Sequence, residues 1–141
     1  MIILAQTDTT VGFLSSESSE LDSIKSRAPS KKYLKVFDSI SSLLEQTRVP
    51  NAHKNAIRQS KKTTFIIKNR AFRVVKDERH KRLISKFKWL YSTSANESNK
   101  SYDRDFCFSK ADIIIEDSRG LYESSSSTIY KLTNSKKIKL R

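Results

Sequence analysis

The chain has 141 residues, of which 28 are Lys or Arg and 15 are Asp or Glu, so its formal net charge is +13. This length supports one small core, and we expect residues 1–141 to form a single domain. The single cysteine excludes an internal disulfide and a cysteine-rich zinc site. The excess of positive charge favours polyanions such as nucleotide phosphates or RNA, although a basic, solvated surface has the same composition.

The sequence also indicates where the protein is located and whether it holds a metal ion. Met1–Leu4 is too short an apolar run for a signal peptide, and no segment approaches the length of a membrane span. We therefore expect a cytoplasmic protein without membrane contact. The acidic residues show no metal-ligand spacing, so no protein-held metal is expected. With two glycines in the chain, a glycine-rich phosphate loop cannot be built.

The first predicted element is a short buried strand over Ile2–Leu4. It runs into the polar residues Thr7–Thr10 and then Gly12. A strand that ends in hydroxyls, with a glycine for a tight turn, presents polar groups at a crevice in α/β proteins. An ordinary polar loop would explain the same residues.

A helix of about two turns is predicted next, because Leu21, Ile24 and Ala28 follow at spacings of three and four. Lys25 and Arg27 lie near its end, where the helix dipole favours cations. That position accounts for both side chains without a ligand.

From residue 33 to residue 88 the chain alternates strand and helix patterns. They predict, in order, a strand over 33–37, helices over 40–47 and 51–60 (the first capped by Asp38 or Ser39), a hairpin of strands over 63–68 and 71–75 that turns at Asn69-Arg70, and a helix over 77–88. Arg73 lies between Phe72 and Val74, so strand alternation places it on the opposite face, and the solvated face is the simpler assignment.

His53 has no acidic or cysteine neighbour at ligand spacing. We interpret His53 as a surface or packing residue. His80 falls on the basic, outward face predicted for the helix over 77–88, whereas Leu83, Ile84 and Phe87 point inward. That basic face could hold RNA, but a run of charge on a helix is more often solvated.

A strand over Trp89–Tyr91 ends in Ser92-Thr93-Ser94-Ala95-Asn96. Hydroxyls and backbone N–H groups that converge on one point suit an anion. An ordinary turn rich in Ser, Thr and Asn is the alternative.

The last third of the chain is predicted as loops and short strands, with Cys107 as a small buried residue. The patterns predict a loop over 97–105, a strand covered on both faces over 112–116, a loop over 117–126, and a final hairpin of strands over 127–132 and 136–140.

Four segments resemble, in the same order, the motifs of the YrdC/YciO family, whose best-known members are threonylcarbamoyl-AMP synthases. Residues 92–96 match its S-T-S-A-N signature, and residues 6–14 look like its P-T-x-T-x-Y-G-L. Residues 25–29 resemble its K-x-R-P, and residues 127–130 resemble its S-T-I-V. In addition, residues 71–74 look like the family's A-V-R-V strand.

The resemblance implies an α/β fold with a single YrdC-like domain, in which helices flank a twisted mixed β-sheet and strand ends line a crevice. It also implies that threonine, bicarbonate and ATP are joined into threonylcarbamoyl-AMP with release of pyrophosphate, for threonylcarbamoyladenosine in tRNA. ATP, accompanied by Mg²⁺, would be a substrate. Implied partners are tRNA or double-stranded RNA and other tRNA-modification proteins.

The family's binding residues can be carried over by motif position. The ATP-binding residues would be Lys25, Arg27, Ser92, Ser94 and Asn96. Lys25 and Arg27 would stabilise phosphate charge, and no residue would act as a covalent nucleophile. The threonine-binding residues would be Thr7, Thr9, Arg73, Ser127 and Thr128.

The chain departs from the family pattern at several positions. Gln6 replaces a proline, Val11 a tyrosine and Phe37 a histidine, and residues 60–63 replace a G-P-x-T segment. We favour the synthase, but a second hypothesis stays open: a non-catalytic module of the same fold that holds double-stranded RNA, tRNA or a nucleotide. An enzyme must bind ATP and threonine together, whereas a module for duplex RNA binds by backbone shape with a steep salt dependence.

Overall fold

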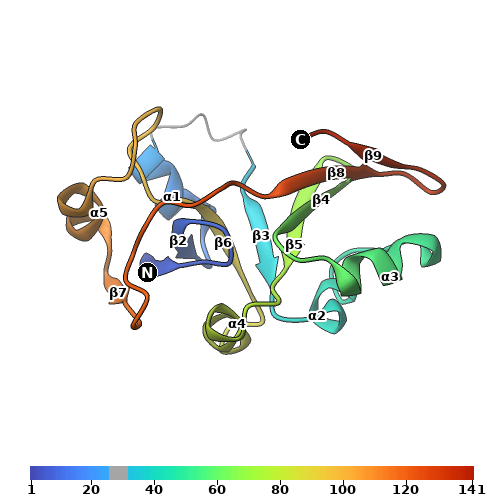
Figure 1. The fold of residues 1–141 in the computed structure, drawn as a ribbon, viewed down its shortest axis with the longest axis horizontal. Helices are drawn as coiled ribbons and strands as arrows, with labels where there is room; N and C mark the ends of the chain where they lie inside the picture. The colour runs from blue at the N-terminus through green and yellow to red at the C-terminus, as the bar shows by residue number, and fades with distance from the viewer. Residues whose placement is uncertain (26–31) are drawn as a thin grey trace.

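A computed structural model of the chain describes residues 1–25 and 32–141. Its strands are β1 (Ile3–Gln6), β2 (Val11–Ser15), β3 (Leu34–Phe37), β4 (Thr63–Ile67), β5 (Arg70–Val74), β6 (Trp89–Ser94), β7 (Ile113–Ile115), β8 (Thr128–Leu132) and β9 (Lys137–Lys139). Its helices are α1 (Ser18–Lys25), α2 (Ile40–Leu44), α3 (Asn51–Gln59), α4 (Glu78–Ser85) and α5 (Arg104–Lys110). The predicted α/β class is confirmed (Figure 1).

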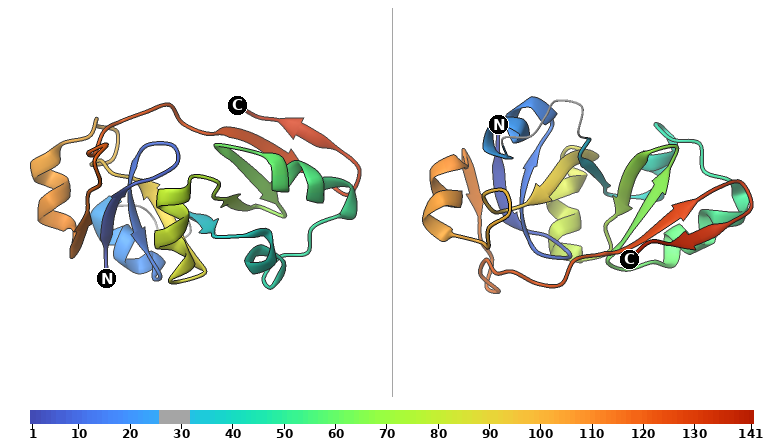
Figure 2. Two further views of the ribbon diagram at one scale, coloured as in Figure 1. Left: turned by 60° about the horizontal axis from the view of Figure 1, so that its bottom comes forward. Right: turned by 90° about the horizontal axis from the view of Figure 1, so that it is seen from above.

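All of these strands belong to one mixed sheet in the order β7-β1-β2-β6-β3-β5-β4-β8-β9. The pairs β1–β7, β3–β5 and β4–β8 are parallel, and the other neighbours are antiparallel. The chain between β7 and β8 runs along the length of the molecule and brings the last hairpin beside β4 (Figure 2). The N-terminal and C-terminal strands therefore lie in different ends of the sheet.

Helices cover the two faces of the sheet unequally. Leu83 and Ile84 of α4 pack on one face, against a cluster that includes Val36 and Leu90. On the opposite face, α1 and α5 pack over β1 and β2, and α2 and α3 pack over β4, β5 and β8. Strand alternation explains this division, because adjacent residues such as Val36 and Phe37 enter cores on opposite faces.

Along β6 and β5, the residues on the α4 face change from apolar to polar. In β6, Leu90 packs under α4, and Ser92 and Ser94 follow on the same face. In the same way Val75, just after β5, packs under α4, and Arg73 lies beyond it. The helix covers one end of this face, and the uncovered end carries the polar groups.

Most predicted elements are confirmed, with their ends shifted by a few residues. Ser39 is the N-cap of α2, and its hydroxyl accepts from Ser42 N. The hairpin between β4 and β5 turns one residue earlier than predicted, because Lys68 and Asn69 adopt positive φ angles of 50° and 62°. The final hairpin of β8 and β9 is confirmed, and Cys107 is fully buried.

The prediction missed two elements near motif residues. Val11–Ser15 forms β2, which pairs with β1 and β6, where the sequence indicated only a turn at Gly12. The expected loop over 97–105 ends early, because Asp103 caps α5 by accepting from the N–H groups of Asp105 and Phe106.

The burial predictions for residues 112–116, His80 and Phe87 are wrong. β7 is at the edge of the sheet and its isoleucines are 38–40% exposed, so it is not covered on both faces. His80 is 2% exposed rather than on the outward face of its helix, because α4 turns it toward the sheet together with Ile84. Phe87 follows the end of α4 and is 38% exposed.

Three further expectations concern His53, the end of the first predicted helix and membrane-spanning segments. His53 is a packing residue, buried with its Nε2 2.7 Å from the carbonyl oxygen of Thr133. Ala28, the last apolar residue of the helix predicted from residue 21, lies outside the described residues. Within residues 1–25 and 32–141, no helix is long and apolar enough to cross a membrane.

Candidate functional site

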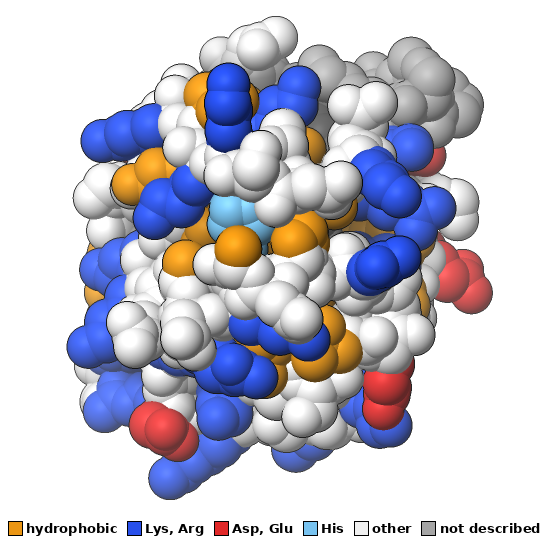
Figure 3. All heavy atoms as spheres, turned by 90° about the vertical axis from the view of Figure 1, so that its right-hand side faces the viewer, with side chains coloured by type: hydrophobic (Ala, Val, Ile, Leu, Met, Phe, Trp, Pro, Cys, Tyr) orange, Lys and Arg blue, Asp and Glu red, His pale blue; other side chains and the backbone are white. Residues whose placement is uncertain are grey.

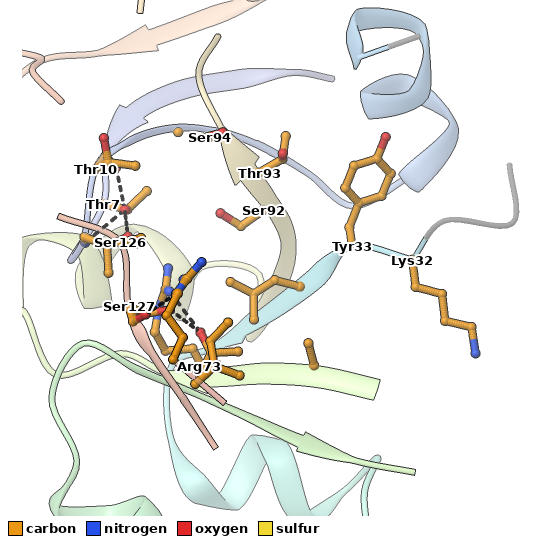
Figure 4. A pocket seen from close by; sticks show the side chains of 17 residues that line it. Thr7, Thr10, Lys32, Tyr33, Arg73, Ser92, Thr93, Ser94, Ser126 and Ser127 are labelled. Carbon is orange, nitrogen blue, oxygen red and sulfur yellow. Dashed lines mark hydrogen bonds between the residues drawn. The ribbon is translucent and has the colours of Figure 1, made fainter. Parts of the chain in front are cut away.

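A pocket of about 340 Å³ occupies the part of the α4 face that the helix leaves uncovered. It is lined mainly by hydroxyl-bearing and basic side chains from strands that are far apart in sequence. Lining residues include Thr7, Thr9, Tyr33, Leu34, Thr64, Arg73, Ser92, Ser94, Ser126, Ser127, Ile129 and Arg141 (Figure 4). The pocket therefore joins the segment after β1 to the middle strands and to the last hairpin.

The turn after β1 holds its threonines in fixed positions. The Thr7 hydroxyl donates to the carbonyl oxygen of Thr10 at 2.6 Å and accepts from the backbone N–H of Thr9 at 3.2 Å. The hydroxyl groups of Thr7 and Thr9 are 3.3 Å apart, and both residues are at least 93% buried. This wall of the pocket is therefore preorganised.

Gly12 is needed for the close packing of this turn against β6. A Cβ atom at this position would lie 2.9 Å from Thr7 Cγ2 and 3.1 Å from the carbonyl oxygen of Thr93. Both distances are shorter than ordinary carbon contacts. The absence of a side chain at Gly12 thus allows Thr7 to pack closely against β2.

The opposite wall is built around Arg73. Its Nε lies 3.1 Å from Oδ1 of Asp8, and both side chains are at most 5% exposed. One terminal nitrogen of Arg73 donates to the Thr64 hydroxyl at 3.3 Å, and that hydroxyl is 2.7 Å from the hydroxyl of Ser127. The solvated position predicted for Arg73 from alternation alone is wrong, because its face of β5 is the floor of the pocket.

Burial sets the electrostatics of this ion pair. It raises the pKa of Asp8, although the charge of Arg73 opposes that shift. Burial also lowers the pKa of Arg73, and the positive charge of Arg141 acts in the same direction. The two side chains form an ion pair but not a well-aligned hydrogen bond, since neither Oδ1 of Asp8 nor Nε of Arg73 has a hydrogen-bond partner.

Arg141 brings a second guanidinium to this end of the pocket. Its Nε donates to the carbonyl oxygen of Ser127 at 3.0 Å, and a terminal nitrogen lies 3.5 Å from the Ser127 hydroxyl. Ser127 is thus bonded through Thr64 to Arg73 and directly to Arg141. An anionic group placed here would meet the guanidinium of Arg141 and the hydroxyl of Ser127, beside Arg73, whose charge is already paired with Asp8.

Lys25 joins the first helix to the end of β6. Its Nζ donates to Oδ1 of Asn96 at 2.6 Å and to the carbonyl oxygen of Asn96 at 2.9 Å, and lies 3.4 Å from the Ser94 hydroxyl. Lys25 is 3% exposed. Asn96 lines a smaller hollow of about 230 Å³ that shares Thr10, Ser94 and Ser126 with the main pocket.

The structure brings together most of the residues predicted for the site. Six of them line the main pocket: Thr7, Thr9, Arg73, Ser92, Ser94 and Ser127. Lys25 and Asn96 lie beside it and bond to Ser94. Thr128 is the residue after Ser127 and does not line this pocket, and Arg27 lies outside the described residues.

Four residues of the site were not predicted from the sequence. Asp8 was seen as part of a polar turn and not as the partner of Arg73. Thr64 shows a local signal, because it is a hydroxyl residue directly before the apolar run Phe65–Ile67. Tyr33 and Arg141 show none, since they reach the pocket only through the pairing of strands distant in sequence.

Comparisons with known proteins find similarity in structure. The sequence matches no family model, and no curated protein is significantly similar to it. The fold matches that of E. coli YciO with a TM-score of 0.79 and 17% identity, over 99% of this chain and 82% of YciO. The solution structure of MTH1692 from Methanobacterium thermoautotrophicum matches with a TM-score of 0.71 and 21% identity, over 99% of this chain and 79% of that protein.

A third match is a protein that was solved with a ligand bound. P. abyssi Sua5, solved in complex with L-threonine, matches with a TM-score of 0.79 and 17% identity. The match covers 99% of this chain and 49% of Sua5, so this chain spans about half the length of that protein. At these identities the similarity establishes the fold, and the fold predicted from the sequence motifs is confirmed.

Proposed function

From its YrdC-like fold, we propose that this chain forms threonylcarbamoyl-AMP from L-threonine, bicarbonate and ATP, for threonylcarbamoyladenosine in tRNA. The observation that carries the proposal is the convergence of separate motif segments on one pocket. Thr7 and Thr9, Ser92 and Ser94, and Ser127 come from three of the four motifs and line the same space. The proposal is also supported by Sua5, which has a similar fold and was solved in complex with L-threonine.

The wall built by Arg73 and Arg141 suits the carboxylate of threonine. Burial lowers the pKa of Arg73 and the nearby charge of Arg141 adds to that shift, so an incoming carboxylate would offset the repulsion between the two guanidiniums. The hydroxyl of Ser127, which already contacts both Arg141 and Thr64, lies where a carboxylate oxygen would bind. Thr7 and Thr9 would face the rest of the amino acid across the pocket.

The other end suits the nucleotide. Ser92 and Ser94 line the pocket there, and the Lys25 ammonium lies against Ser94 and Asn96. In this proposal Lys25 and Arg27 bind phosphate oxygens, and Arg27 is assigned by motif position. Among the described residues no three His, Cys, Asp or Glu side chains form a metal-binding group, so Mg²⁺ would arrive bound to the phosphates of ATP and offset their charge.

The reaction needs no protein nucleophile. The threonine amine adds to bicarbonate and water is lost, giving a carbamate, and a carbamate oxygen then attacks the α-phosphorus of ATP while pyrophosphate leaves. The chain's residues orient the two reactants and stabilise negative charge on the phosphate oxygens. A pocket of preorganised hydroxyls and cations is suited to both tasks.

The test is pyrophosphate release from ATP by the purified chain, with threonine and bicarbonate omitted in turn. We expect release only when both are present, and a loss of at least about tenfold in Arg27→Ala, because one phosphate contact contributes roughly 1.5–3 kcal/mol. Lys81→Ala, on the half-exposed face of α4, is the matched control and should release pyrophosphate at the unsubstituted rate.

Two results would contradict the proposal. Release that continues without threonine would indicate simple ATP hydrolysis. Absence of release, while ATP still binds, would favour the second hypothesis, a binding module in which Gln6, Val11 and Phe37 replace the residues expected for turnover.

A further inference from the structure

Cations are common on the surface of this chain, so an exposed Lys or Arg does not by itself mark a site. Figure 3 shows Lys and Arg side chains over most of the end of the molecule that carries α3 and β9. Lys35 differs from these, because it lies in the middle of the sheet and is only half-exposed. The other residues of its strand, β3, are apolar. A lysine at such a position needs a structural explanation.

Three neighbouring strands present a row of side chains on the same face as Lys35. Lys35 lies opposite Tyr91 of β6 and opposite Phe72 of β5 in the register of the sheet. Residues that lie opposite each other on neighbouring strands point to the same face. Phe72 packs in the cluster under α2 and α3, so the row lies on the face of the sheet away from α4.

A cavity of about 320 Å³ lies over this row of side chains. Asp22 of α1 lines one side of it, and Gln46, which follows α2, lines another. In Figure 1, β3 runs between α1 and α2, and the cavity occupies this interval between the helices. Its volume is large enough for a small organic ligand.

The Lys35 ammonium is held over aromatic rings at the floor of the cavity. Its Nζ lies 4.2 Å from the ring centre of Trp89 and 5.4 Å from that of Tyr91. It donates to Oε1 of Gln46 at 3.0 Å. Because an ammonium group carries several N–H donors, this arrangement fixes the position of Nζ and leaves it able to bind a further acceptor.

A second cation lies close enough to act on Lys35. Burial lowers the pKa of Lys35, and the charge of Arg70 lowers it further. In the part of the chain that the structure describes, neither residue forms an ion pair. The carboxylate of Asp22, across the cavity, accepts a hydrogen bond from the Tyr33 hydroxyl at 2.7 Å. An anion between Lys35 and Arg70 would therefore offset a repulsion within the folded chain.

We propose that this cavity binds a small aromatic anion, a carboxylate or phosphate carried on a flat ring. The charged group lies between the Lys35 ammonium and the Arg70 guanidinium, and the ring packs on Tyr91 and Phe72, since aromatic rings favour offset or edge contacts with one another. A cation–π contact alone would explain where Lys35 lies. It would leave the repulsion from Arg70 unopposed.

The proposed site is separate from the pocket assigned to threonine and ATP. Adjacent residues of a strand point to opposite faces, and the neighbours of Lys35, Phe72 and Tyr91 line that pocket: Leu34, Arg73 and Ser92. The two cavities share part of a rim at the start of β3, formed by Lys32 and Tyr33. Binding of the anion needs neither ATP nor threonine, so the proposal can be tested whether or not the chain is a synthase.

The single tryptophan of the chain makes binding measurable. Trp89 contacts the Lys35 ammonium, so its fluorescence should change when the cavity fills. The full chain is titrated with benzoate and with phenyl phosphate, without ATP or threonine. Benzamide supplies the ring without the charge, and acetate and inorganic phosphate supply the charge without the ring. We expect benzoate or phenyl phosphate to bind at least about tenfold more tightly than these three compounds.

Substitutions locate the anion within the molecule. Lys35→Met removes the charge and keeps a long apolar side chain, and should weaken binding at least about tenfold. Arg70→Gln changes an exposed residue that the fold does not need, and should weaken binding at least about threefold. Lys131→Met, at an exposed position of β8 that lines neither cavity, is the matched control and should bind as the unsubstituted chain does. Calorimetric titration confirms these affinities, because Lys35→Met also changes the surroundings of Trp89.

Several results would overturn the proposal. Equal binding of benzamide would show that charge is not used, and equal binding of acetate or inorganic phosphate would show that the ring is not used. Absence of binding by both aromatic anions, or unchanged affinity in both Lys35→Met and Arg70→Gln, would also contradict it. If Arg141→Gln weakens binding and Lys35→Met does not, the anion lies in the other pocket and the proposal is wrong. A preference for benzoate or for phenyl phosphate identifies the charged group and supports the site in either case.

Discussion

Two parts of the chain use charge in different ways. Residues 46–76 and 124–141, the basic half, contain 14 Lys and Arg and no Asp or Glu, whereas residues 1–45 and 77–123, the balanced half, contain 14 Lys and Arg and all 15 acids. In the balanced half, cations pair with acids of the same half, as Arg119 does with Asp77 and Asp117 at 2.8 Å and Arg104 with Glu116 at 3.9 Å. The contact with Arg119 lowers the pKa of Asp117 to about 2, mainly through the hydrogen bond between the two side chains. The basic half has no acids of its own, so its charges act on whatever approaches from outside.

The candidate pocket lies where the two halves meet, and each half supplies a different chemistry. Hydroxyls of Thr7, Ser92 and Ser94 come from the balanced half, and the guanidiniums of Arg73 and Arg141 come from the basic half. The ion pair between Asp8 and Arg73 crosses the boundary. A site of mixed hydroxyls and cations therefore arises from the junction and from neither half alone.

Removal of the Arg73 side chain tests this junction most strongly. Arg73→Met leaves Asp8 buried without its partner, and we expect a loss of about 3–5 kcal/mol in the free energy of unfolding, measured by urea denaturation. Adding Asp8→Asn to this variant should recover most of the lost free energy of unfolding, because the unpaired charge is then removed. A loss below about 1 kcal/mol in the single variant would show that the ion pair does not hold the halves together.

A second test uses pH and the buried His80. Burial, reinforced by the charge of Arg73, lowers its pKa from 6.5 to about 4. The unfolded chain therefore binds more protons between these values, so stability is complete above pH 6.5 and is lost as pH falls toward 4. The loss should be about 3 kcal/mol.

The matched variant for this test is His80→Leu, which cannot titrate. Urea denaturation of both proteins from pH 7 to pH 4 should show that the variant lacks the part of the loss between pH 6.5 and 4. If both proteins lose the same free energy over that range, a group other than His80 is responsible. Asp8 acts in the opposite direction: its raised pKa makes stability fall as pH rises above 3.8.

A smaller effect is expected at Gly12, in the hydroxyl wall of the balanced half. Gly12→Ala places a methyl group against Thr7 and the backbone at Thr93, so the wall must shift, at a cost of about 1–3 kcal/mol in the free energy of unfolding. The displacement of Thr7 should also weaken the threonine binding proposed for the pocket, which calorimetric titration can measure. Gly120→Ala is the control for the loss of a glycine: its Cβ meets nothing closer than 3.9 Å, but its positive φ of 74° makes the change costly without touching the pocket.

The smallest effect should come from an exposed ion pair. Lys88 lies 3.7 Å from Glu45, and their side chains are 65% and 62% exposed. Glu45→Gln should change the free energy of unfolding by less than about 0.5 kcal/mol, because solvent screens such pairs. A change above about 1 kcal/mol would mean that surface pairs contribute to the balanced half more than their exposure implies.

Local patterns in the sequence predicted much of the fold and of the site. Strands such as β4 and β5 and their hairpin follow from runs of β-branched and aromatic residues. The hydroxyls at Thr7, Ser92 and Ser127 stand directly after or before such runs, and the structure places them in one pocket. Each of these features can be predicted from the residue types at a few neighbouring positions.

The features that were missed depend on contacts between distant segments. β2 exists because Gly12 pairs with Ser94, 82 residues later, and a glycine is weak evidence for a strand. His80 was assigned to a basic surface because of the cations around it, yet it is four residues before the buried Ile84 and so shares its face. Arg141 enters the pocket only because β9 pairs with β8.

The burial of Cys107 gives the molecule an internal reporter. It is the single thiol of the chain, and no part of it is exposed within the core between α5 and β1. Its pKa is raised by burial, which reduces the reactive thiolate further. A thiol reagent can therefore modify the folded protein only when α5 lifts from the sheet, and the rate of that reaction measures how often this end of the molecule opens.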